Sequence, residues 1–273
     1  MKFFSIIKLT FRESFAKKTF IAFMSISTLI GLLFIFALNL DIVDGAQSAV
    51  SLFGIDAPEL VNVQDIIEGV EGAVSVLLFT AGIFMSLFAT SSLIPALLQP
   101  GYVDLLITKP LGRMEILSAR FIGAVAIVLF NIFYLILLTW LIMSIKTGLW
   151  NWGFLLSGII IVITFTILYS LMTFLSMLSG SGPFSLMITY LILFFSPILL
   201  QRDNIYALLS SKYYGYFVDG LYYFLPKTAE LGNITQQLAR NVTVSSWMPL
   251  WTSLLFGILM FALSGLIFQK KDF

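Results

Sequence analysis

The chain has 273 residues, of which 59% are hydrophobic and only 11% are charged, and its formal net charge is +1. So apolar and so nearly neutral a composition excludes a soluble globular domain and gives no sign of a nucleic-acid partner. The absence of cysteine and histidine excludes disulfides, haem, iron–sulfur clusters, His-ligated zinc and Cys- or His-dependent catalysis, including that of a rhomboid-like protease.

Residues 1–18 predict an amphipathic helix. Four apolar residues recur at helical spacing on one stripe, whereas Lys2, Arg12 and Lys17 lie off it. The stripe consists of Phe4, Ile7, Phe11 and Phe15. A basic amphipathic helix is typical of the membrane interface. We therefore expect an elbow helix on the inner leaflet before the first crossing; a generic basic anchor is the alternative interpretation.

Long uncharged stretches follow, and each fits a membrane helix of roughly 20 residues. The longest, 147–201, is broken by Ser-Gly-Ser-Gly-Pro at 179–183 and fits two helices. Lipid leaves only helices or closed barrels for the backbone, and barrel strands alternate and are shorter. The predicted spans are 20–40, 73–97, 121–145, 154–177, 184–200 and 248–268. The sequence thus predicts an all-α integral membrane protein, with residues 1–273 as one domain.

The distribution of lysine and arginine predicts the orientation. With the N-terminus inside, ten basic residues fall on cytoplasmic segments and five on external ones. Basic residues near spans favour the cytoplasm. We expect both termini and segment 99–120 in the cytoplasm, in the cell membrane of a prokaryote. Segments 41–71 and 201–246 are then external.

The external segment 201–246 is rich in tyrosine and phenylalanine, as is typical of a membrane-interface belt. We expect short helices there, some of them dipping into the outer leaflet, with breaks at Pro226 and Gly232.

The predicted spans have no Asp, Glu, Lys or Arg well inside them. Ion-coupled transporters place ionisable groups there, so the pattern disfavours an ion-driven pump. The chain also lacks a Gly-Lys dipeptide and hence a phosphate-binding loop. Any ATP is therefore expected to be used by a separate subunit.

Segment 99–120 carries the most specific motif of the chain. It resembles the cytoplasmic loop between the second and third spans of ABC-2 type ABC transporter permeases. The residues that match in order and spacing are Gly101, Asp104, Leu105, Leu106, Lys109, Pro110, Arg113, Glu115, Ile116, Leu117 and Arg120, whereas Pro100 and Tyr102 depart from the family pattern.

The resemblance implies that this segment is a coupling loop that docks on the ATPase subunit. Asp104 begins a short helical turn, which Pro110 ends because the residue before a proline avoids helix. Lys109, Arg113 and Arg120 are then expected to face the cytosol or phosphate headgroups. An ordinary basic inside loop is the alternative interpretation.

By the same resemblance, the chain is expected to be the permease subunit of an ABC-2 type exporter. Its partners would be an ABC ATPase, which uses ATP and Mg²⁺, and a second permease copy or close homologue in the bilayer. Ala119-x-x-x-Gly123 offers a close-approach face for that second copy. A non-transporting scaffold or assembly subunit partnered with an ABC-type ATPase is the alternative. No catalytic constellation, metal site or cofactor bound by this chain is expected.

Overall fold

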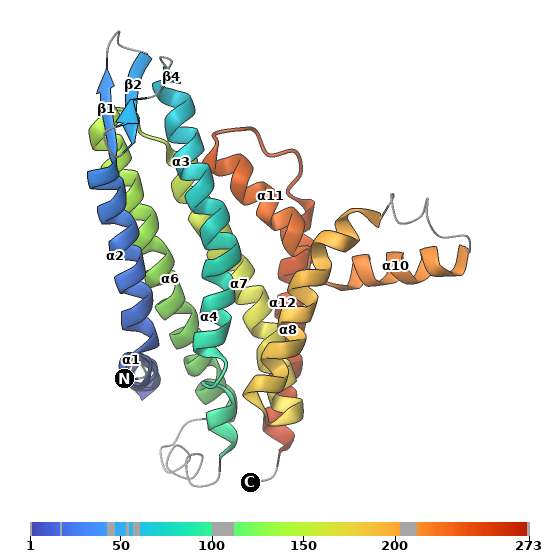
Figure 1. Ribbon diagram of the computed structural model, residues 1–273. Coiled ribbons are helices and arrows are strands. Elements are labelled where there is room, and N and C mark those ends of the chain that lie inside the picture. Colours follow the sequence, from blue (N-terminus) through green and yellow to red (C-terminus); the bar gives the residue numbers. More distant parts are fainter. Residues whose placement is uncertain are drawn as a thin grey trace.

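The computed structural model describes residues 2–16, 18–42, 47–52, 55–56, 61–99, 112–202 and 212–271. Long helices run side by side in a bundle with a small antiparallel sheet at one end (Figure 1). We call this the sheet end. α1 and the last turn of α12 lie at the opposite end of the bundle, which we call the terminal end.

The helices differ in length and in type. They are α1 (Lys2–Ala16), α2 (Thr19–Ala37), α3 (Val63–Leu77), the π-helical turn η1 (Leu78–Gly82), α4 (Ile83–Thr90), the 3₁₀ turn η2 (Pro95–Leu98), α6 (Arg113–Thr147), α7 (Trp152–Ser179), α8 (Gly182–Leu200), α10 (Lys212–Phe224), α11 (Thr228–Ala239) and α12 (Met248–Lys270). Within the described residues, five helical stretches are long and apolar enough to cross a membrane: Val63–Leu98, α6, α7, α8 and α12. The bent pair α1–α2, with 70° between its parts, is a sixth candidate.

Five long apolar helices indicate a multi-pass membrane protein, as the composition predicts. The bend before α2 falls at Lys18, which has a left-handed φ of 58°. Its amide donates to the carbonyl of Phe15, at 3.1 Å, and its carbonyl accepts from the amide of Ala22, at 2.9 Å. This residue therefore ends α1 and begins the first turn of α2.

Two helices begin earlier than the sequence predicts. α3 begins at Val63 inside the predicted external segment 41–71, because the side chain of Asn62 accepts from the amide of Gln64, at 3.0 Å. α6 begins at Arg113 inside the predicted loop 99–120. The charged residues near these two helix starts are therefore carried on helices rather than on loops.

The described part of segment 38–62 forms short strands, an exception to the all-α prediction that holds for the bundle. They are β1 (Leu38–Ile42), β2 (Gln47–Leu52), β3 (Ile55–Asp56) and β4 (Val61–Asn62). β2 pairs antiparallel with β1, β3 and β4, and Leu38 lies opposite Leu52 in the register. The sequence Leu-Asn-Leu-Asp-Ile of β1 alternates apolar and polar residues, which is the period of a strand.

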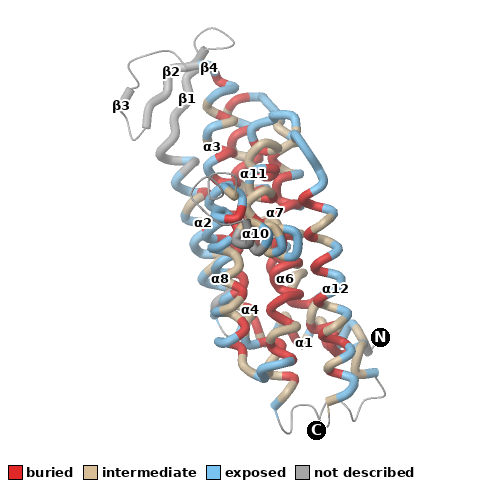
Figure 2. The backbone as a smooth tube through the Cα atoms, turned by 90° about the vertical axis from the view of Figure 1, so that its right-hand side faces the viewer, coloured by how far each residue is buried: buried red, intermediate tan, exposed pale blue. Residues whose placement is uncertain are grey.

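α7 is the central helix, and burial is concentrated along α6 and α7 (Figure 2). Paired serine hydroxyls connect α7 to its neighbours: Ser75–Ser157 at 3.0 Å to α3, and Ser176–Ser185 at 2.8 Å to α8. Small polar residues are typical of contacts between membrane helices, because they allow close approach and hydrogen bonds in a medium without water.

The predicted short helices of segment 201–246 are present as α10 and α11. α10 projects away from the bundle, whereas α11 packs on α7, α3 and α8 (Figure 1). Pro226 separates the two helices, as predicted, but Gly232 lies inside α11 and does not break it. A Cβ at Gly232 would come within 3.0 Å of the Phe79 ring, so this glycine serves close packing.

Candidate functional site

The strongest charged contact of the described chain joins α1 to α6 at the terminal end. The Arg120 guanidinium donates to both carboxylate oxygens of Glu13, at 2.6 and 3.0 Å, and to the hydroxyl of Thr10 at 3.4 Å. Arg120 is fully buried. A buried arginine is tolerated when a carboxylate pairs with it. The burial of this part of α6 therefore depends on α1.

This contact corrects the expectation that Arg120 faces the cytosol or headgroups. The amphipathic helix α1 covers it, because three residues at successive turns of α1 face the bundle. These are Ile6, Thr10 and Ser14, all buried. The only sequence signal was that Glu13 is the single acidic residue among the first eighteen.

The predicted apolar stripe of α1 is only partly covered by the rest of the bundle. Phe4 is 73% exposed and Phe15 is 46% exposed, while Ile7 and Phe11 are half-buried. α1 therefore presents one face to α6 and a second, aromatic face outward. This arrangement fits a helix that lies against lipid.

The close-approach motif of α6, Ala119-x-x-x-Gly123, is covered by another helix of the same chain. A Cβ at Gly123 would come within 3.0 Å of Thr10 on α1, and Ala119 is fully buried. The interpretation of Ala119-x-x-x-Gly123 as a face for a second copy is therefore wrong, since α1 already covers it.

Arg113 joins α6 to α12 instead of facing the cytosol freely. Its guanidinium donates to the carbonyls of Phe268, Gln269 and Lys271 at the end of α12. The last carbonyls of a helix have no partner within the helix, and a basic side chain satisfies them. Arg113 therefore stabilises the C-terminal end of α12.

Glu115 caps α6, as its carboxylate accepts from the amide of Gly112 at 3.1 Å. The Lys271 ammonium donates to the carbonyl of Met177, at 3.1 Å, at the end of α7. The terminal end is thus a junction of four helices, α1, α6, α7 and α12, which we call the terminal junction. The other predicted coupling residues, Gly101, Asp104, Leu105, Leu106, Lys109 and Pro110, lie outside the described residues.

A buried acid lies toward the sheet end. Glu71 of α3 is 1% exposed and accepts from the side-chain amide of Asn151, at 2.7 Å. The same amide donates to the carbonyl of Ala239, at 2.8 Å, at the end of α11. Sequence reasoning assigned Glu71 to the external segment 41–71 and missed this contact. Glu71 follows Asp65 and Glu68 on the same helix, and nothing in the local sequence distinguishes the buried acid from the other two.

Comparison with known proteins adds no assignment. A scan against models of protein families finds no model that matches the chain. A search of curated proteins likewise finds no match.

Proposed function

We propose that the chain is the membrane subunit of an ABC-2 type transporter that works with a separate ATPase subunit. The ordered motif in segment 99–120 supports this, together with an amphipathic helix before the first candidate span. α1 and the last turn of α12 lie at the same end of the bundle (Figure 1), which supports an even number of crossings. The proposed pathway consists of two such subunits, or of one with a close homologue.

The terminal junction is the observation that carries the proposal. The chain enters the junction at the first turn of α6, and the motif continues from segment 101–111 into this helix, where Arg113, Glu115 and Arg120 belong to it. Arg120 connects this part of α6 to α1, and Arg113 connects it to α12. A force applied to the preceding segment by a partner would therefore move three helices together.

The proposal is tested by reversing one charge of the motif and measuring ATPase association. Lys109→Glu is preferable to a change at Arg113, because Arg113 also holds α12. The protein is purified from its native membranes in a mild detergent, and ATP hydrolysis and the co-purifying ATPase are quantified. We expect Lys109→Glu to lower both at least tenfold, since the resemblance assigns Lys109 to the segment that docks on the ATPase.

Lys8→Glu is the matched control, because Lys8 is an exposed basic residue on α1 near the same junction. We expect it to retain the ATPase. Equal retention in both variants, or absence of any ATPase from the unmodified protein, contradicts the proposal. ATP-driven movement of solutes in reconstituted vesicles separates a transporter from a scaffold.

A further inference from the structure

An apolar groove of about 390 Å³ lies between η1, α8 and the start of α11. Its walls are Phe79, Thr80, Ala81, Phe84, Leu193, Phe194, Pro197, Thr228 and Ala229. The Phe84 ring stacks on Tyr190 at 4.0 Å between centroids, which fixes one wall. A π-helical turn such as η1 is rare and is found frequently at functional sites.

One end of the groove is polar. Thr228 is 1% exposed, and its hydroxyl has no hydrogen-bond partner within the described part of the chain. Most buried hydroxyls have a partner, because burial without one is costly. The neighbouring amide of Ala229 is already satisfied by the Ser196 hydroxyl, at 3.0 Å. The other hydroxyl of the lining, that of Thr80, already donates to the carbonyl of Val76, at 2.7 Å, so within the described residues Thr228 supplies the one hydroxyl of the groove without a partner.

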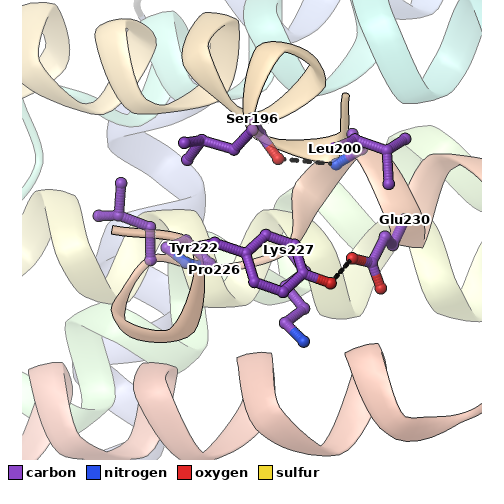
Figure 3. A pocket seen from close by; sticks show the side chains of 9 residues that line it. Ser196, Leu200, Tyr222, Pro226, Lys227 and Glu230 are labelled. Atoms are coloured by element: carbon purple, nitrogen blue, oxygen red, sulfur yellow. Dashed lines mark hydrogen bonds between the residues drawn. The ribbon is translucent and has the colours of Figure 1, made fainter. Parts of the chain in front are cut away.

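The polar end lies beside residues typical of a membrane interface. Lys227 precedes Thr228, and its ammonium lies 4.4 Å from the ring centroid of Tyr222. The Tyr222 hydroxyl donates to the Glu230 carboxylate (Figure 3). Tyrosine and lysine mark the depth of lipid headgroups. The ester groups of glycerolipids lie just below that depth, next to the acyl chains.

We propose that this groove binds one acyl chain of a membrane glycerolipid, whose ester carbonyl accepts a hydrogen bond from Thr228. The apolar walls suit the chain, and a single neutral donor suits a neutral carbonyl. A free carboxylate is disfavoured, because a buried charge needs an opposite charge. The Lys227 ammonium lies over Tyr222, which is not among the groove residues. The inference does not depend on the proposed transport function.

The test uses the full-length protein in vesicles with a phospholipid that carries a diazirine in one ester-linked acyl chain. After photolysis, labelled peptides are identified by mass spectrometry. We expect the label on residues 79–84 and 193–197. An ether-linked analogue lacks the ester carbonyl. We expect it to label these residues about fivefold less, because it cannot accept the hydrogen bond from Thr228.

Two variants complete the test. Thr228→Val keeps the shape but removes the donor, and we expect it to lower ester-lipid labelling about fivefold without lowering ether-lipid labelling further. Ala81→Phe fills the groove and is expected to lower labelling at least tenfold with either lipid. Thr252→Val is the matched control, since the Thr252 hydroxyl already bonds to the carbonyl of Met248, at 3.1 Å.

Equal labelling by ester and ether lipids in the unmodified protein overturns the role of Thr228 without any variant. Unchanged labelling in Ala81→Phe overturns the groove as the binding site. Stronger labelling by a diazirine fatty acid than by the phospholipid identifies a different ligand and also overturns the proposal. Because the measurement needs no ATPase, its failure is distinct from failure of the proposed function.

Discussion

The two ends of the bundle bury one ionisable side chain each, and they stabilise it in different ways. At the terminal junction, the fully buried group is the Arg120 guanidinium, which pairs with Glu13, whose side chain is 27% exposed. Toward the sheet end, Glu71 is buried against the neutral amide of Asn151. Breaking a buried ion pair leaves an uncompensated charge, whereas a carboxylate held by an amide can be replaced by a neutral acceptor. Stability at the terminal junction therefore depends on both charges. Toward the sheet end it depends on the hydrogen bond and not on the charge of Glu71.

The largest effect is expected for Arg120→Met, which keeps the apolar stem but removes the charge. The partly exposed Glu13 carboxylate and the buried Thr10 hydroxyl then both lose the guanidinium that donates to them, and we expect the free energy of unfolding to fall by about 3 kcal/mol. Thermal unfolding in detergent measures this change. Arg12→Met removes an exposed basic charge from α1 and serves as the control, with an expected change within about 0.5 kcal/mol.

The double variant Glu13→Gln/Arg120→Met sharpens this test, because it removes both charges. We expect it to be more stable than Arg120→Met alone, with a coupling energy of about 1–3 kcal/mol. Additive losses would show that the pair does not act as a unit.

Two matching substitutions address the difference between the ends directly. Glu71→Gln keeps an oxygen that accepts from Asn151, so we expect a change in unfolding free energy of less than about 0.5 kcal/mol. Glu13→Gln loses the ion pair with buried Arg120, and we expect a loss of about 2–3 kcal/mol. Both losses are measured by thermal unfolding. Similar losses for Glu71→Gln and Glu13→Gln would contradict the proposed difference between the two ends of the bundle.

Glycine substitutions test the packing at the sheet end. A Cβ at Gly153, near the start of α7, would meet the carbonyl of Leu238 on α11 well inside contact distance. We expect Gly153→Ala to destabilise the protein by about 1–3 kcal/mol, because a backbone atom must shift. Gly69→Ala in α3 meets nothing within 4 Å, and we expect it to stabilise by up to about 1 kcal/mol. Thermal unfolding in detergent compares the two variants. Equal effects would show that the close contact between Gly153 and the Leu238 carbonyl does not affect stability.

The smallest effect concerns a titration outside the spans. Burial raises the pKa of Tyr222 to about 12, and the hydrogen bond to the Glu230 carboxylate raises it as well. The folded state therefore holds this phenol neutral, and its contribution to stability is lost as the pH rises from the ordinary pKa of 10 through 12.

Difference absorbance at 295 nm between the unmodified protein and Tyr222→Phe isolates this group. In a Glu230→Gln background, the same difference is expected to show a lower pKa for Tyr222. An unchanged midpoint would show that Glu230 does not influence the phenol.

Local composition and period determined much of this protein from the sequence. The apolar runs predict the membrane helices because a helix in lipid satisfies its own backbone, and spacing on one stripe predicts α1. Helix starts were predicted too late at 63 and 113, since charged first turns resemble loops when neither caps nor tertiary contacts are known.

Only the tertiary structure decided which polar groups are buried and against what. Arg120 and Glu13 are 107 residues apart in the chain, and Glu71 and Asn151 are 80 residues apart. No local pattern relates such positions, because their contact depends on how whole helices pack. The same holds for Gly123, which matches a pairing motif in sequence but is covered by α1 in the fold. Hydrophobic periodicity specifies which face of a helix avoids water, whereas the packing of helices specifies which neighbour covers it.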